Sequence, residues 1–126
     1  MTEIKYTKDH QWIRLEDNGN AVVGITDYAQ QQLGDVVFVE LPTVGAEVAR
    51  DAQLALVESV KSAGEVMSPV SGTVIEINAG LNDEPGTINS DPTGAGWFFK
   101  LKLSAPAELE TLLDEPAYQA FLATLG

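Results

Sequence analysis

The sequence predicts a mostly β fold, a sandwich or barrel of short strands, with one small internal helix and a helical C-terminus. Three observations predict it. Segments rich in β-branched and aromatic residues recur between residues 3 and 103, as is typical of strands. Turn sequences with Gly, Pro, Asn or Asp separate these segments. After residue 104 the pattern becomes that of helices, with Pro and Glu in a first turn.

The first elements form a predicted hairpin. Residues 3–16 carry aromatic and branched side chains at short intervals and fit one or two strands. The sequence DNGN at 17–20 favours a turn, and residues 21–25 (AVVGI) favour the next strand.

A short helix is predicted over 27–33 (DYAQQQL). Thr26 stands where an N-cap belongs, and Asp27 adds negative charge to the first turn. Gly34 supplies a stop, and residues 35–41 are again typical of a strand.

Residues 53–60 (QLALVESV) predict a strand that is buried on much of both faces. Residues 61–65 interrupt it, with Gly64 as the expected site of unusual backbone angles, before the apolar run resumes. The strand at 73–78 should place Thr73, Ile75 and Ile77 on one face.

Residues 80–96 are rich in Gly, Pro and Asn, so a long loop is expected there. A last strand follows over 97–103. Two helices, over 106–113 with Glu108 placed as in a capping box and over 116–124, complete a helical segment of about 105–124. The 126 residues, 44% of them hydrophobic, suit a single domain over 1–126.

The net charge of the chain limits the kinds of partner that it can bind. With 19 acidic and 7 basic residues the net charge is −12, which disfavours nucleic acid and anionic membranes. It favours basic protein partners and, through self-repulsion, a monomer. The sequence has no apolar run long enough to span a membrane and no signal segment, so we expect a cytoplasmic protein.

The sequence has few residues of the types that form catalytic sites. There is no Cys, and His10 is the only histidine, so neither a metal site nor a nucleophilic triad is indicated. Acidic residues that are neighbours in the sequence are expected to be solvated surface charges. The large aromatic residues are read as core, namely Trp12, Trp97, Phe98 and Phe99. We therefore expect no enzyme activity.

Lys61 is the most informative residue. It follows an apolar strand directly and begins the turn before the next apolar segment, so a two-stranded support should display its side chain. By position alone, a solvated turn lysine is the simpler interpretation. The segment around it changes this.

The segment ESVKSAGEVMSPVSG at 58–72 resembles the lipoylation segment of glycine cleavage system H proteins. The resemblance extends from Lys5 to Tyr118 and includes KYTKDHQW at 5–12, VGITDYAQQQLGDVVFVELPTVG at 23–45, INSDP at 88–92 and GW at 96–97. Biotinyl domains, with Ala-Met-Lys-Met, and lipoyl domains of 2-oxo acid dehydrogenases, with Asp-Lys-Ala, fit less well.

The resemblance implies a barrel-sandwich hybrid fold and lipoic acid joined to Lys61 by an amide. It implies a carrier that takes an aminomethyl group from glycine decarboxylase to the aminomethyltransferase and is reoxidised by dihydrolipoyl dehydrogenase. A lipoyl-attaching enzyme is a fourth expected partner.

By the same resemblance, a cleft formed by Asp9, His10, Gln11 and Glu65 should shelter the loaded arm. This sequence has Gln11 where the family usually has Glu, and Thr93 where the long loop often has Tyr. Losing a carboxylate removes one partner for a protonated amine, so Gln11→Glu should slow loss of the amine if the cleft shelters it.

Three alternatives stay open from the sequence. The chain could be an H-like relay that donates lipoyl groups to other enzymes, an unmodified acidic interaction domain, or a carboxylate-dependent enzyme. Reconstitution with partners, the mass of the natural protein, and turnover without partners would separate them.

Overall fold

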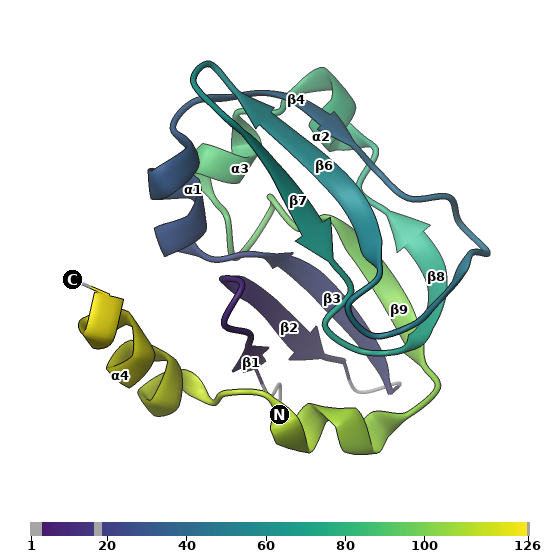
Figure 1. The fold of residues 1–126 in the computed structure, drawn as a ribbon. Helices are drawn as coiled ribbons and strands as arrows, with labels where there is room; N and C mark the ends of the chain where they lie inside the picture. The colour runs from purple at the N-terminus through teal and green to yellow at the C-terminus, as the bar shows by residue number, and fades with distance from the viewer. Residues whose placement is uncertain (1–3, 17–18, 126) are drawn as a thin grey trace.

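Two antiparallel sheets form the fold in a computed structural model that describes residues 4–16 and 19–125 (Figure 1). The strands are β1 Ile4–Tyr6, β2 Gln11–Leu15, β3 Asn20–Ile25, β4 Val36–Glu40, β5 Glu47–Val48, β6 Gln53–Ser59, β7 Ala63–Met67, β8 Gly72–Ile77 and β9 Phe99–Leu103. The helices are α1 Asp27–Leu33, α2 Gly80–Asp83, α3 Thr87–Ser90 and α4 Glu115–Leu125, with a 3-10 helix at Pro106–Thr111. The predicted mostly β architecture is confirmed.

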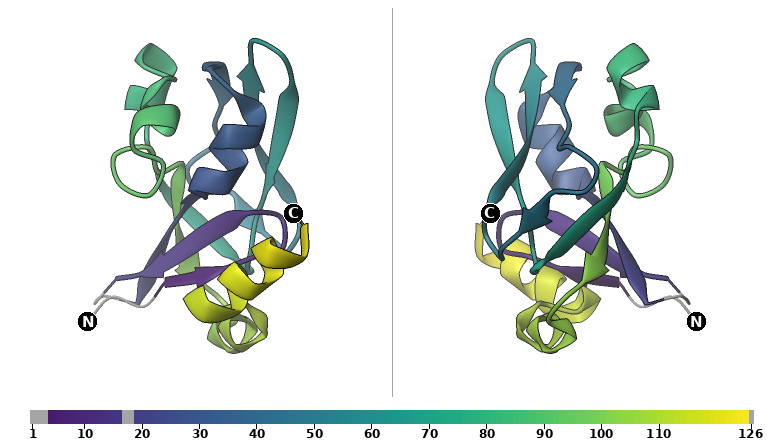
Figure 2. Two further views of the ribbon diagram at one scale, coloured as in Figure 1. Left: turned by 90° about the vertical axis from the view of Figure 1, so that its left-hand side faces the viewer. Right: turned by 90° about the vertical axis from the view of Figure 1, so that its right-hand side faces the viewer.

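The two sheets differ in size. Within the described residues, the larger has six strands in the order β1-β2-β3-β9-β8-β5, and the smaller has the order β4-β6-β7. Figure 2 shows the long β6–β7 hairpin standing beside α1, and α4 lying beside β1 at the lower end of the molecule. The chain order implies that several connections cross from one sheet to the other, as in a sandwich.

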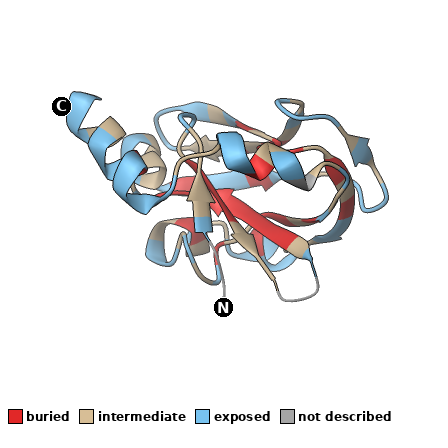
Figure 3. Ribbon diagram, turned by 90° about the horizontal axis from the view of Figure 1, so that it is seen from below, coloured by how far each residue is buried: buried red, intermediate tan, exposed pale blue. Residues whose placement is uncertain are grey.

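The core lies between the sheets, and both contribute branched and aromatic side chains to it. Members from the larger sheet include Ile13, Val23, Phe99 and Leu101, and members from the smaller include Val39, Ala55, Val57 and Val66. Figure 3 shows the buried residues along the central strands, whereas α4 is mostly exposed. The expectation of a single domain stays a prediction.

The first predicted elements are confirmed. Strands β2 and β3 pair from Gln11↔Ile25 to Leu15↔Ala21; the turn residues Asp17 and Asn18 lie outside the described part. Helix α1 begins after Thr26, whose side chain accepts a hydrogen bond from the Ala29 N–H. It ends at Gly34, whose φ of 80° suits glycine.

The central hairpin differs from the prediction in two ways. Strand β6 is not buried on both faces: Ala55 and Val57 are buried, while their neighbours are only partly covered, because the small sheet faces the core on one side. Residues 61–65 do not all interrupt the strands, since β7 starts at Ala63. Gly64 pairs with Val57 inside the ladder and has no positive φ.

The predicted face of the strand at 73–78 is wrong. Val74 is the buried side chain, whereas Ile75 is 36% exposed. The register with β9 shifts between Val74 and Glu76, and such a bulge breaks the two-residue alternation on which the prediction relied.

The predicted long loop at 80–96 contains two single-turn helices, α2 and α3. Leu81 and Ile88 are buried in the core, and each tethers its helix. Two isolated apolar residues anchor this segment without making a periodic pattern, so composition alone indicated a loop. Trp97 is only partly buried and lies under the Lys100 ammonium group, 5.3 Å from the ring centroid; its assignment to the core was wrong.

The C-terminal helical segment is present, but the predicted helix at 106–113 is a 3-10 helix. Glu108 makes no capping box. Its carboxylate accepts hydrogen bonds from the Ser71 N–H at 2.6 Å and the Ser71 hydroxyl at 3.1 Å. The Glu108 carboxylate therefore fixes the turn before β8. The helix predicted over 116–124 is present as α4.

Candidate functional site

The side chain of Lys61 is exposed at the tip of the β6–β7 hairpin, as the sequence predicted. The Ser59 hydroxyl organises this tip. It accepts hydrogen bonds from the N–H groups of Lys61 at 3.3 Å and Ser62 at 3.0 Å. The Ser59 N–H also donates to the Ser62 carbonyl at 2.8 Å. A serine two residues before the lysine therefore closes the turn and holds the lysine backbone outward.

The hairpin tip is fastened to the start of β4. The Val60 N–H donates to the Asp35 carbonyl at 3.0 Å. The Lys61 stem passes over Gly34: a Cβ added at Gly34 would lie 3.1 Å from the Lys61 Cε. The bare backbone of Gly34 thus leaves the room that the lysine stem occupies, and a side chain there would crowd it.

Asn89 of α3 builds the platform beneath this contact. Its side-chain nitrogen donates to the Gly34 carbonyl at 2.8 Å and to the Gln30 side chain at 3.0 Å. Its side-chain oxygen accepts from the Val36 N–H at 2.8 Å. Sequence reasoning missed this role; the only signal was the INSDP match.

The structure brings the four predicted cleft residues into one groove. Asp9, His10, Gln11 and Glu65 line a cavity of about 190 Å³. Its remaining wall is largely apolar and includes Ile25, Ala29, Leu33, Val57 and Val66. The groove reaches Leu33 and Gly64, which lie near the lysine platform. A chain extended from Lys61 towards Leu33 would therefore meet a largely apolar cavity whose wall also carries the carboxylates of Asp9 and Glu65.

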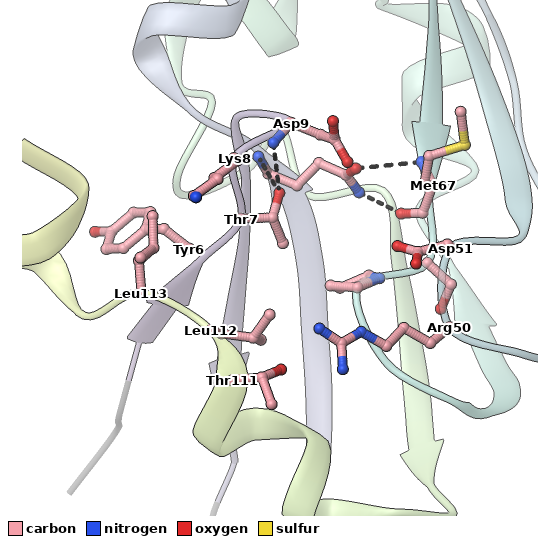
Figure 4. Close-up of a pocket in the computed structure, with 13 residues that line it drawn as sticks. Tyr6, Thr7, Lys8, Asp9, Arg50, Asp51, Met67, Thr111, Leu112 and Leu113 are labelled. Atoms are coloured by element: carbon pink, nitrogen blue, oxygen red, sulfur yellow. Dashed lines mark hydrogen bonds between the residues drawn. The ribbon is translucent and has the colours of Figure 1, made fainter. Parts of the chain in front are cut away.

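Gln11 contributes its side-chain amide to the framework of the groove. The residue is 2% exposed, its Nε2 donates to the Met67 carbonyl, and its Oε1 accepts from the Met67 N–H at 3.3 Å (Figure 4). The amide therefore ties β2 of the larger sheet to β7 of the smaller. A carboxylate could make only one of these two bonds, because it has no proton to donate.

Gln11→Glu should lower the free energy of unfolding at pH 7 by about 1–3 kcal/mol, the cost of leaving the part-buried Met67 carbonyl without its donor. A neutral carboxyl can donate again, so folding favours its protonated form. The loss should therefore shrink as the pH falls towards about 4.3, the ordinary pKa of Glu. Urea denaturation at several pH values measures it. Gln119→Glu at an exposed position of α4 should leave stability nearly unchanged; equal losses in both variants would contradict the bridging role.

His10 stands at the end of the groove on a strained backbone. Its φ is 64°, a conformation uncommon for a residue with a side chain. The ring packs against that of Tyr28, with centroids 4.4 Å apart and planes tilted by 38°, and its Nδ1 lies 2.9 Å from the Tyr118 hydroxyl. Burial lowers the pKa of the His10 imidazole, while the nearby Asp9 carboxylate acts in the opposite direction.

Thr93 does not join this groove. It lines another cavity with Tyr28 and Tyr118, and its carbonyl accepts from the Arg14 guanidinium at 3.2 Å. A further cavity, of about 210 Å³, shares Asp9 and Gln11 with the groove but opens towards Arg50 and Leu112 (Figure 4). In the described part of the chain, no helix is long and apolar enough to cross a membrane.

The chain is similar to known proteins over nearly its whole length. Residues 4–125 match the family model described as Glycine cleavage H-protein. The glycine cleavage system H protein of Methylocella silvestris is 60% identical over 126 residues, covering all of both chains. That of Thermotoga maritima is 55% identical over 123 residues, covering 98% of each.

A solved structure has the same fold. The crystal structure of a glycine cleavage system H protein from Mycobacterium marinum superposes with a TM-score of 0.88 at 36% identity, covering 96% of this chain and 97% of that one. Sequence and structure agree, and this chain belongs to the glycine cleavage H-protein family.

Proposed function

We propose that Lys61 is the residue that carries the lipoyl group, joined through an amide to its side-chain nitrogen. The exposed side chain at the hairpin tip is the observation that carries this proposal. The Ser59 turn presents it, and the bare Gly34 backbone leaves room for its stem. An amide removes the lysine charge, which suits a stem that continues into an apolar groove.

The chain is the lipoyl carrier of the glycine cleavage system and has no catalytic activity of its own. A lipoyl group held on Lys61 would supply the sulfur chemistry for carrying an aminomethyl group from glycine decarboxylase to the aminomethyltransferase, with dihydrolipoyl dehydrogenase as the partner for its reoxidation. The protein supplies a fixed point of attachment, which makes each partner's reaction local to a docked complex.

We further propose that the groove lined by Asp9, His10, Gln11 and Glu65 shelters the loaded arm. Asp9 and Glu65 would hold a protonated amine by charge, and the apolar wall would exclude water. Gln11 would act by holding the two sheets in place around the groove. We place this exchange in the cytoplasm, where reducing conditions favour a dithiol arm.

Peptide mapping of the protein from lipoate-supplied cells tests the attachment site. We expect one lipoyl adduct, on the peptide that contains Lys61, because the tip presents this amine on a rigid support. Lys102 is also exposed but lies within strand β9, where a modifying enzyme would meet a sheet rather than a tip. An adduct on another lysine, or none, would contradict the proposal.

A further inference from the structure

A hydrogen-bond chain links the C-terminal helix to the groove. The Tyr118 hydroxyl of α4 lies 2.7 Å from the Thr26 hydroxyl and 2.9 Å from the His10 Nδ1. Tyr118 is 3% exposed, and its ring stacks on Tyr6 with centroids 4.7 Å apart. The tyrosine is therefore held firmly, and its hydroxyl has two polar partners.

The directions of these bonds follow from the buried hydroxyl of Thr26. Thr26 is 3% exposed, and its oxygen already accepts from the Ala29 N–H. In the described part of the chain, only Tyr118 offers its hydroxyl proton an acceptor. Thr26 therefore donates to Tyr118, and Tyr118 donates to the Nδ1 of His10. This order requires a neutral His10 ring with its proton on Nε2.

Protonating His10 would put three protons on two hydrogen bonds. The Nδ1–H would donate to the Tyr118 oxygen, and the hydroxyl proton of either Tyr118 or Thr26 would then lose its acceptor. A buried donor without a partner carries a free-energy cost. The chain therefore favours the neutral ring, in the same direction as burial, which lowers the pKa of His10.

Few charges face this ring. Asp9 and Glu65 share the groove with it, and Lys8 lies over the Phe121 ring, whose centroid is 5.8 Å from that of His10. From α1 and α4 the ring meets the uncharged side chains of Tyr28, Tyr118 and Phe121. The Asp9 carboxylate favours a proton on His10, whereas the hydrogen bond from Tyr118 favours the neutral ring.

We propose that Tyr118 is a positioning residue that keeps His10 uncharged in the wall of the groove, so that Asp9 and Glu65 alone set the charge met by an amine on the arm. This inference rests on the proposed function of Lys61 and the groove. A charged imidazole beside the amine would repel it and occupy the carboxylates. The C-terminal helix thus belongs to the site, although it lies outside both sheets.

Tyr118→Phe tests the chain, because the protein has one histidine and its ring signals in NMR are unambiguous. In the wild-type protein we expect the neutral ring to carry its proton on Nε2. In Tyr118→Phe the titration midpoint of His10 should rise by roughly 0.5–1 pH unit, the equivalent of one hydrogen bond. Tyr28→Phe keeps an aromatic ring packed against His10 and should leave the midpoint unchanged. A proton on Nδ1 in the wild type, or equal midpoints, would overturn the proposal.

The loaded protein supplies the second readout. In Tyr118→Phe the rate at which the carried amine is released as ammonia should be at least about twofold higher at about pH 6 than at about pH 8. In the wild type the same change of pH should raise this rate by less. A shifted titration midpoint of His10 with no change in the rate of amine release would overturn the proposed role of Tyr118 in the groove. Mass of Tyr118→Phe should still show the lipoyl adduct. Its absence from both proteins would instead overturn the proposed function of Lys61, independently of the titration.

Discussion

Protein with Lys61→Arg should carry no lipoyl group and should support no glycine decarboxylation above background when combined with the purified partner enzymes. Arginine keeps the positive charge and a long stem, so the exposed tip has no reason to unfold. Its guanidinium, however, offers no amine that can be acylated at the same position. Lys61→Arg should therefore abolish lipoylation and glycine decarboxylation while leaving the free energy of unfolding unchanged.

The matched control is Lys102→Arg, at another exposed lysine. This variant should be lipoylated and active like the wild type. Intact mass measures lipoylation, urea denaturation measures stability, and carbon dioxide release from labelled glycine measures activity. Residual activity of Lys61→Arg that depends on lipoate would show that another lysine carries the arm.

Gly72→Ala should lower the free energy of unfolding by about 3 kcal/mol, a large part of the stability of a chain this size. Gly72 lies in β8 between Val48 and Leu103, its partners in the neighbouring strands. An added Cβ would lie 2.5 Å from the carbonyl oxygen of Lys102. That atom belongs to the backbone of the sheet and cannot turn aside as a side chain would.

Gly86→Ala is the matched control for this substitution. No atom lies within 4 Å of a Cβ at position 86, and the residue has a helical φ of −62°. Alanine there should be neutral or slightly stabilising. Urea denaturation of both variants separates a steric effect at Gly72 from a general effect of losing glycine; similar values for the two would refute the steric explanation.

Elements with local signals were predictable from the sequence. Helix α1 has a capping threonine, an acidic first turn and a terminal glycine within nine residues, and all of these signals act through neighbouring backbone groups. The Lys61 tip was predictable for the same reason, since a turn between two apolar strands is a local pattern.

Features that depend on distant partners were not predictable. Glu108 looked like a capping residue, but it bonds to Ser71 across 37 positions, so a tertiary contact replaced a local one. The short helices at 80–90 depend on the burial of Leu81 and Ile88 rather than on periodicity. Tyr118 reaches His10 over 108 positions, and composition carries no trace of that pairing.

The Gln11–Met67 bridge has a consequence for how the molecule behaves in crowded solution. Strand β7 borders the small sheet, and a bordering strand with open N–H and C=O groups invites another chain to add a strand. The Gln11 amide occupies both groups of Met67, as a residue of a neighbouring strand would, and the exposed acid Glu65 lies on the same border. At Met67 the border of β7 therefore offers no free backbone groups to a second copy of the protein, which disfavours self-association by strand addition at this point.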